Sequence, residues 1–402
     1  MDMPLKPNVL EDIGRDHSLP APPPPEKIHS QDDQVMLEDE SGRIKLVGKI
    51  LADAQLVTGV IVGVLGADTG NGEFEVVDLC FAGMAPQTGE DDEMDTEDTF
   101  LCSDGSTRNG YIAFISGLDI GSTPASEAQT QVLTEYLTGA CGDLDGQGFA
   151  SQISRLVILG NSLAPLGPIG APANEDNDKE DEKPRRRGND TTSFSPHPVQ
   201  SLSAHLHDLS QSLAVHILPG ESDPSGSILP QQAPPRAMFG PASSYSSSLV
   251  RQTPHTSVLP QECKQGDGDV DPSGSAPTRT ILATSGQPLN DMSKYVPTAP
   301  TTRLDLAEAT LKWRHIAPTA PDTLWCHPFF ALDPFIISQT PDIYAIGCQP
   351  QFATRLVKDG NRRSRVVLVP SFAQTGILVL VGLRSLDVWI VRLTEDIISH
   401  SG

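Results

Sequence analysis

The chain has 402 residues, of which 38% are apolar, 35 are proline and 34 are glycine. Its 52 acidic and 28 basic residues give a net charge of −24, so the sequence lacks the basic excess of proteins that grip a nucleic-acid backbone. The length allows two or three domains with at least one large core, and the proline and glycine content predicts that part of the chain is unstructured.

Cysteine usage and hydropathy predict an intracellular, soluble protein. The six cysteines lie far apart without a C-x-x-C pair, which disfavours a zinc ribbon or a disulfide framework. The N-terminus has no apolar segment typical of a signal peptide. The longest apolar run, residues 376–383, is too short to cross a bilayer.

The N-terminal part of the chain is predicted to be β-rich. Residues 1–40 are polar and broken by prolines, so we expect order to begin near residue 41. Two β-branched runs on either side of Gly70-Asn71-Gly72 predict a hairpin. With a further strand at 111–120, these short strands favour a small β-barrel, such as an OB-fold, over residues 41–125.

Residues 126–402 show strands alternating with helices, which is typical of an α/β domain. Residues 155–163 predict a buried parallel strand. Leucines at 202, 206, 209 and 213 fall on one face of a helix, and residues 215–218 predict the next strand. A helix is predicted at 304–316, and further strands are predicted at 280–287, 342–349, 365–372, 376–383 and 387–393.

Three segments with few core-forming residues are expected to lie outside the packed structure. The acidic tract 90–98 predicts an exposed loop, and residues 165–197 and about 252–277 predict disordered insertions. The run Arg185-Arg186-Arg187 lies in the first insertion. It fits a nuclear-localisation element, although a solubilising role is the more common one for such a run.

No nucleotide-binding loop is present, and the string Gly160-Asn161-Ser162 lacks the second glycine of a serine hydrolase elbow. The histidines fit structural roles better than metal binding: His205 and His207 on a solvated helix face, and His315 and His327 in an ordered turn. Glu221 and Asp223 could bind a hard cation, but carboxylates in such a loop are also common turn formers.

Several strings together resemble the small (B) subunits of DNA polymerase delta in a fungal-like version. The most specific are PGE-x-DP and LPQQ within 218–232, and RHI-x-PTAPDTL within 314–324. The resemblance runs in order from about 41 to 390. It implies an OB-fold barrel followed by a calcineurin-like phosphodiesterase domain that lacks its active site, in an overall β plus α/β architecture.

The resemblance also implies a function. We expect a nuclear, non-catalytic scaffold subunit that uses no cofactor, contacts DNA only indirectly and does not bind membranes. Its partners would be the C-terminal metal-binding domain of the polymerase delta catalytic subunit and the elongated third subunit. The acidic barrel has few aromatic residues (Phe74, Phe81, Phe100 and Tyr111), which favours protein binding over single-stranded DNA binding.

The metal-binding motifs of the phosphodiesterase family are expected to be degenerate. The D-x-H motif would follow a strand predicted at LTEYLTG, near Thr138-Gly139-Ala140, where neither residue type occurs. The other motifs would place former metal positions at Asn161, Glu221, Ser222, Asp223, Cys348 and Pro350.

Two other functions stay open at this point. The chain could be an active metal-dependent phosphodiesterase, or the small subunit of a different replicative polymerase. Members of the family usually carry more sequence before the segment MPLKPNVLEDIG, so we also expect an N-terminal truncation that leaves the barrel open and a sheet edge exposed.

Overall fold

The computed structural model describes residues 26–30, 32–87, 110–141, 144–165, 197–224, 228–245, 255–260, 278–297, 299–330 and 332–393. The chain divides into two compact units. The first comprises Met1–Met94, Gln287–Thr340 and Arg355–Val366, and the second comprises Asp95–Gly286, Pro341–Thr354 and Val367–Gly402. The acidic tract 90–98, most of the insertion 165–197 and the arginine run at 185–187 lie outside the described residues.

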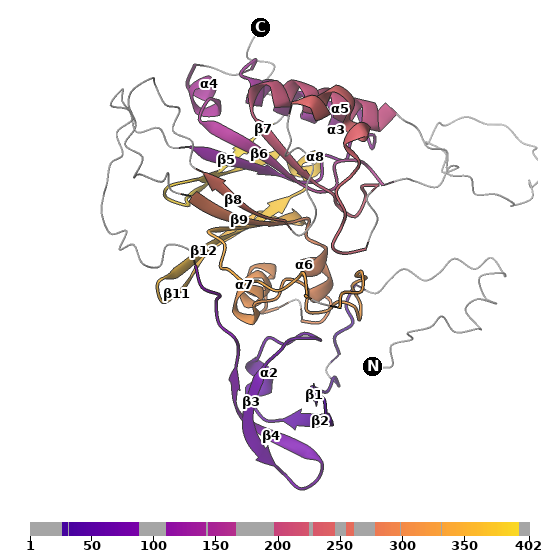
Figure 1. Cartoon of the computed structure of the whole chain (residues 1–402), viewed down its shortest axis with the longest axis vertical. Helices are drawn as coiled ribbons and strands as arrows, with labels where there is room; N and C mark the ends of the chain where they lie inside the picture. The colour runs from indigo at the N-terminus through magenta and orange to yellow at the C-terminus, as the bar shows by residue number, and fades with distance from the viewer. Residues whose placement is uncertain are drawn as a thin grey trace, which may run out of the picture. The chain divides into compact units, whose positions relative to one another are not determined.

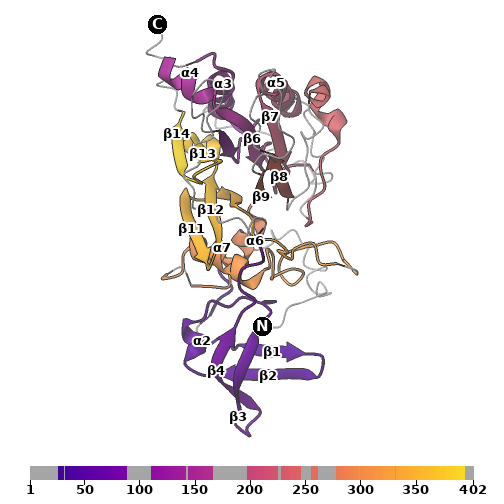
Figure 2. The same ribbon diagram turned by 60° about the vertical axis from the view of Figure 1, so that its left-hand side comes forward.

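The first unit begins with a four-stranded sheet in the order β1-β2-β4-β3 (Figure 2). β1 (Met36–Asp39) pairs antiparallel with β2 (Gly42–Val47), and β2 pairs in parallel with β4 (Glu73–Cys80). β3 (Gly63–Asp68) and β4 form the predicted hairpin, which is thereby confirmed. A short helix, α2 (Ile50–Asp53), lies between β2 and β3. Order begins earlier than expected, because β1 lies inside the segment 1–40.

Two helices, α6 (Gln287–Met292) and α7 (Arg303–Trp313), belong to the same unit. α7 confirms the helix predicted at 304–316, and it begins with a capping box between Thr302 and Asp305. The residue after α7, Arg314, donates from Nε to the carbonyl oxygen of Gly83 at 2.9 Å and from Nη2 to that of Met84 at 3.1 Å. These bonds fix the chain that leaves β4.

The second unit contains a five-stranded sheet in the order β14-β13-β5-β6-β7. Figure 1 labels β5, β6 and β7, and Figure 2 labels β13 and β14. The strands β5 (Tyr111–Ile115), β6 (Ile153–Leu159) and β7 (Ala214–Leu218) are parallel. β13 (Ile377–Gly382) pairs antiparallel with β5 and with β14 (Val388–Arg392). The helices are α3 (Pro124–Thr138), α4 (Leu144–Ala150), α5 (His197–Ser212), the 3₁₀ segment η1 (Arg236–Ser244) and α8 (Phe372–Thr375).

A second sheet has the order β11-β12-β10-β9-β8. Its strands are β8 (His255–Pro260), β9 (Thr278–Thr284), β10 (Ile343–Gln349), β11 (Ala353–Asp359) and β12 (Arg362–Pro370), and the boundary between the units falls within β11 and β12. β9 and β10 are parallel, whereas β8 is antiparallel to β9. The expectation that 252–277 is disordered is therefore wrong for 255–260, where backbone pairing with β9 forms a strand.

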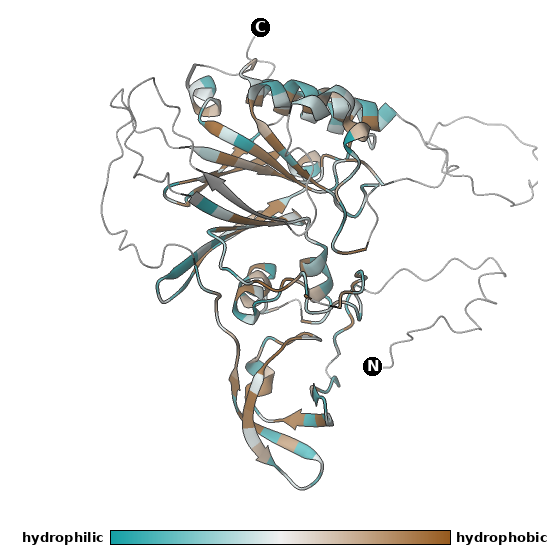
Figure 3. Ribbon diagram, viewed as in Figure 1, coloured by the Kyte–Doolittle hydropathy of each residue, from teal (hydrophilic) through white to brown (hydrophobic). Residues whose placement is uncertain are grey.

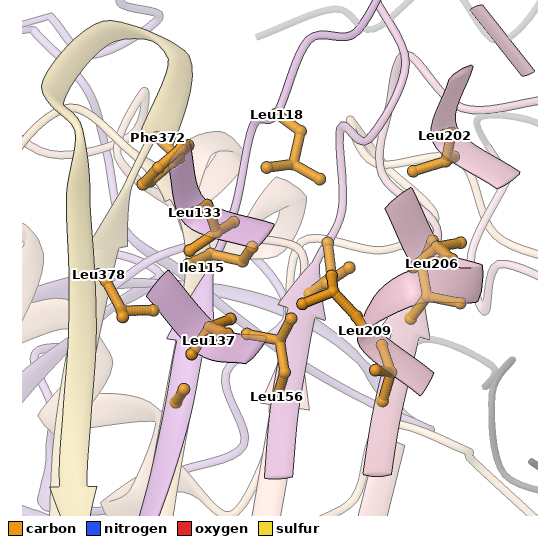
Figure 4. Packing of buried hydrophobic residues seen from close by; sticks show 14 of the residues in the cluster. Ile115, Leu118, Leu133, Leu137, Leu156, Leu202, Leu206, Leu209, Phe372 and Leu378 are labelled. Carbon is orange, nitrogen blue, oxygen red and sulfur yellow. The ribbon is translucent and has the colours of Figure 1, made fainter. Parts of the chain in front are cut away.

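The core of the second unit lies between the β5-β6-β7 sheet and the helices α3 and α5 (Figure 4). Leu202, Leu206 and Leu209 of α5 are buried against residues such as Ile115 and Leu156, so the predicted leucine face is confirmed for these three. Leu213 follows the end of α5 and is half-buried. Figure 3 colours the chain by hydropathy: the strands of the sheets contain hydrophobic segments, whereas α3 and α5 are largely hydrophilic or intermediate. None of the helices in the described residues is both long and apolar enough to span a membrane.

Two predictions near the start of this unit are wrong. Residues 111–115 do not extend the N-terminal barrel, because β5 pairs in parallel with β6 at the centre of the second unit's sheet. The segment LTEYLTG is not a strand but the end of α3, which terminates at Gly139 in the left-handed conformation. Leu133, Tyr136 and Leu137 are spaced three and four residues apart, which fits a helix whose buried face includes Leu133 and Leu137.

Candidate functional site

A pocket of about 600 Å³, lined mainly by residues with polar side chains, lies where β5, β6 and β7 end. The carboxyl ends of parallel strands are where open α/β sheets bind ligands. The pocket's lining includes three of the predicted positions, Asn161, Glu221 and Ser222. The remaining lining residues are Asp119, Ser122, Thr123, Ser126, Pro165, Ala373 and Gln374.

Close backbone packing joins the ends of β6 and β7. A Cβ atom added to Gly220 would lie 2.2 Å from the backbone nitrogen of Asn161, so only glycine fits there. Asn161 adopts a φ of 53°, which asparagine tolerates better than most residues. Its Oδ1 accepts a hydrogen bond from the backbone N–H of Ser222 at 3.3 Å. The Asn161 side chain therefore holds the second loop in place.

Asp223 organises the same loop from behind the pocket. Its carboxylate accepts backbone N–H groups from Gly220 at 2.7 Å, Leu163 at 3.0 Å and Ser162 at 3.3 Å. The residue is only 8% exposed. Burial raises the pKa of Asp223, and the hydrogen bonds from these N–H groups oppose that shift. Both carboxylate oxygens are thus occupied by the protein's own backbone.

Cys348 lies at the end of β10, where it meets the end of β6. Its Sγ is 3.6 Å from the carbonyl oxygen of Leu159, and its backbone N–H donates to Ser116 Oγ at 2.9 Å. A Cβ atom on Gly347 would lie 2.3 Å from the same Leu159 oxygen, so the two strands touch through their backbones. Burial raises the pKa of the Cys348 thiol, with smaller contributions from Asp223 and Asp119. The thiol therefore stays protonated at neutral pH.

The LPQQ string has a structural explanation that sequence reasoning missed. Gln231 is fully buried, and its Nε2 donates to the carbonyl oxygen of Gly220 at 3.0 Å. Ser285 Oγ donates to Gln231 Oε1 at 3.1 Å. The glutamine therefore connects the β7 loop to the residue that follows β9. Its position after a turn-forming proline gave no signal of this role.

Sequence reasoning also missed Asp119, which lies in the loop after β5 and lines the pocket. β5, the neighbour of β6 in the sheet, ends at Ile115, whereas the D-x-H motif was expected near Thr138-Gly139-Ala140, at the end of α3. A Gly-x-Asp string directly after an apolar strand was the available signal. This signal is weak, because residues 111–120 fit a barrel strand equally well.

The other candidate metal ligands do not converge on the pocket. His315 Nε2 lies 2.9 Å from Asp333 Oδ2, within the first unit, and His327 is exposed. His205 is half-buried, not on a solvated face as predicted. Its Nδ1 lies 3.2 Å from Thr134 Oγ1, and burial lowers the pKa of its imidazole. Pro350 is exposed. Among the described residues, no group of three or more His, Cys, Asp or Glu side chains has a geometry suited to a metal ion.

Two family models match the sequence. One describes the B subunits of DNA polymerases alpha and epsilon and matches residues 112–354. The other describes the OB-fold domain of the DNA polymerase delta subunit and matches residues 1–79. The N-terminal part thus carries the predicted OB-fold domain.

Three curated relatives are each named DNA polymerase delta small subunit. The one from Arabidopsis thaliana is 35% identical over 392 residues, covering 96% of this chain and 78% of the relative. The one from Oryza sativa subsp. japonica is 32% identical, with 96% and 80% covered. The one from Saccharomyces cerevisiae is 32% identical, with 98% and 77% covered.

Proposed function

The chain belongs to the family of DNA polymerase delta small subunits, and from this premise we propose that it is a non-catalytic scaffold subunit of a polymerase delta complex. In this role it takes part in DNA replication and repair in the nucleus. It bridges the C-terminal metal-binding domain of the catalytic subunit and the elongated third subunit. It contacts DNA only through these partners.

We also propose that the second unit is a calcineurin-like phosphodiesterase fold whose active site has degenerated. The parallel strands β5, β6 and β7, which end at the pocket, support this assignment. A two-metal phosphodiesterase needs carboxylate, imidazole and amide ligands that are free to clamp two dications. At the corresponding strand ends this chain has Asn161, Glu221, Ser222, Asp223, Cys348 and Pro350.

The observation that carries the non-catalytic proposal is the bonding of Asp223. Its carboxylate is the most buried acidic group at these positions, yet three backbone N–H groups occupy its oxygens. Coordination of a cation would require breaking these bonds, and each buried N–H left without an acceptor costs about 1–3 kcal/mol. A protonated Cys348 thiol beside the Leu159 carbonyl oxygen is also a poor ligand.

An exposed apolar segment supports a role in protein binding. Between Trp325 and Ile336 the first unit exposes several large apolar side chains, including Trp325 at 70%, Phe330 at 98% and Leu332 at 84%. Large exposed apolar side chains that lie close together in the sequence are typical of interaction sites when they form one surface patch. Tryptophan and phenylalanine are also among the residue types enriched at protein–protein interfaces.

The rival function, an active metal-dependent phosphodiesterase, is tested by measuring metal content and turnover. The purified chain is dialysed against Mn²⁺ or Zn²⁺, its bound metal is measured by mass spectrometry, and hydrolysis of bis-p-nitrophenyl phosphate is followed. We expect no stoichiometric metal and no turnover above that of the free ion. Stoichiometric metal together with hydrolysis that is lost in Asp223→Asn would overturn the proposal.

A further inference from the structure

The pocket at the ends of β5, β6 and β7 is lined by acidic side chains and by no basic ones. Two carboxylates, Asp119 and Glu221, line it, and none of its lining residues is Lys, Arg or His. The other polar groups are hydroxyls and amides, among them Thr123, Asn161 and Gln374. A phosphate ester would therefore meet negative charge without any cation to offset it, whereas a cationic group would be attracted.

The half-buried carboxylate of Asp119 accepts few hydrogen bonds that would offset its burial. Among the described residues its side chain has a single hydrogen bond, a long one of 3.4 Å from Ser371 Oγ to Oδ2. Burial raises the pKa of Asp119, and the bond from Ser371 offsets only part of this effect. Asp223, in contrast, has three N–H donors. A donor entering the pocket would supply what Asp119 lacks.

The N-terminus of α3 at the pocket wall offers few free groups to an anion. Pro124, its first residue, has no N–H group, and the N–H of Ser126 is capped by Thr123 Oγ1 at 3.2 Å. Ser126 Oγ donates to the carbonyl oxygen of Thr123 at 2.8 Å. Glu127 adds a negative charge in the first turn. The cap and the carboxylate of Glu127 thus already offset part of the positive end of the helix dipole.

We propose that this pocket receives the guanidinium group of an arginine presented by a partner polypeptide. Arginine fits better than lysine, because its planar fork of five donors can engage more than one acceptor, whereas the lysine ammonium is a compact point charge. The net charge of −24 favours the approach of a cationic surface. This inference rests on the proposed scaffold function, since it assigns one contact to a partner of that scaffold.

The first test uses N-acetyl-L-argininamide as a probe, titrated into the full chain by NMR or calorimetry. The double variant Asp119→Asn with Glu221→Gln removes both charges with little change in shape, and asparagine tolerates the φ of 47° at position 119. The matched control, Asp53→Asn with Glu75→Gln, removes two exposed carboxylates of the first unit. We expect the probe to bind the pocket variant about tenfold more weakly and the control unchanged.

Two further probes exclude other ligands. N-acetyl-L-citrullinamide has the same shape without the charge, so it should bind at least about tenfold more weakly than the arginine probe. Thymidylyl-(3′→5′)-thymidine, a phosphodiester, should not bind. Equal binding of the arginine and citrulline probes, or binding of the phosphodiester that the pocket variant abolishes, would overturn the inference.

The second test uses the complex. The wild-type chain, the pocket variant and the control variant are each co-expressed with the polymerase delta catalytic and third subunits, and dissociation is followed at rising salt. We expect the pocket variant alone to dissociate faster. If all three chains remain equally bound, the pocket inference fails while the scaffold proposal stands. If the wild type does not associate at all, the scaffold proposal itself fails.

Discussion

The carboxylate of Asp223 accepts the backbone N–H of Leu163 at 3.0 Å, although the two residues lie 60 positions apart in the chain. The bond joins the loop after β7 to the loop after β6, at the edge of the sheet where a metal-dependent enzyme would hold its ions. In this chain the carboxylate instead holds the two loops together through hydrogen bonds to their backbone N–H groups.

Replacing Asp223 with alanine should destabilise this edge by about 3 kcal/mol, because three backbone N–H groups lose their acceptor in a buried place. Native-state hydrogen exchange of the Leu163 N–H reports the local effect, and thermal unfolding reports the global one. Glu221→Ala, at an exposed neighbouring position, should change stability by less than about 0.5 kcal/mol. Equal effects of the two substitutions would contradict the structural role of Asp223.

Gly347→Ala should destabilise the contact between β10 and β6. Its added Cβ would meet the Leu159 carbonyl oxygen at 2.3 Å, so backbone must shift, and we expect a loss of about 3 kcal/mol. The control is Gly148→Ala in α4, where nothing lies within 4 Å of the new Cβ and alanine favours the helix by about 1 kcal/mol. Thermal unfolding should move in opposite directions for the two variants. A neutral Gly347→Ala would show that the strands are not packed this closely.

Cys348 should be unreactive in the folded chain, because burial raises the pKa of its thiol and keeps the nucleophilic thiolate scarce. Exposed Cys80 provides the internal control. Brief treatment with iodoacetamide at pH 8, followed by peptide mass spectrometry, should show alkylation of Cys80 and none at Cys348. Rapid alkylation of Cys348 without unfolding would mean that this strand end is open to solvent.

Arg355 should add stability that depends on pH. Burial alone would raise the pKa values of Asp305 and Glu308, but hydrogen bonds to groups including Arg355 outweigh it and lower both. Lowered carboxyl pKa values give stability that is present above the unfolded values of 3.8 and 4.5 and is lost as pH falls below them.

Arg355→Met should therefore cost about 0.5 kcal/mol at pH 7, with the difference from wild type shrinking towards pH 3. The melting temperature measured across this range checks it. Arg43→Met, which removes a pair between two largely exposed side chains, should have a smaller effect at every pH. A difference that grows as the pH falls would have the wrong sign.

The sequence predicted elements well where local patterns matched the packing. The leucines of α5 and the glycine turn between β3 and β4 each follow from spacing or turn chemistry alone, and both are present. Residues 111–115 show the limit of this reasoning. The residues of a short apolar strand do not indicate which sheet the strand joins. The pattern of residues 111–115 therefore predicts a barrel strand, although β5 pairs with β6. That error also hid Asp119.

The bonding around the site could not be predicted from residue types. Glu221 and Asp223 are two acidic residues of one loop, yet one lines the pocket and the other is enclosed by backbone N–H groups. This difference depends on where the β6 loop runs, which is a tertiary contact. The buried position of Gln231 depends in the same way on Gly220 and Ser285.

The most direct test of the central claim, that the chain is a non-catalytic scaffold of polymerase delta, is co-expression of the full chain with the catalytic subunit, followed by size-exclusion chromatography with light scattering. We predict a stable complex of one copy of each chain. Separate elution of two folded proteins at micromolar concentration would contradict the claim.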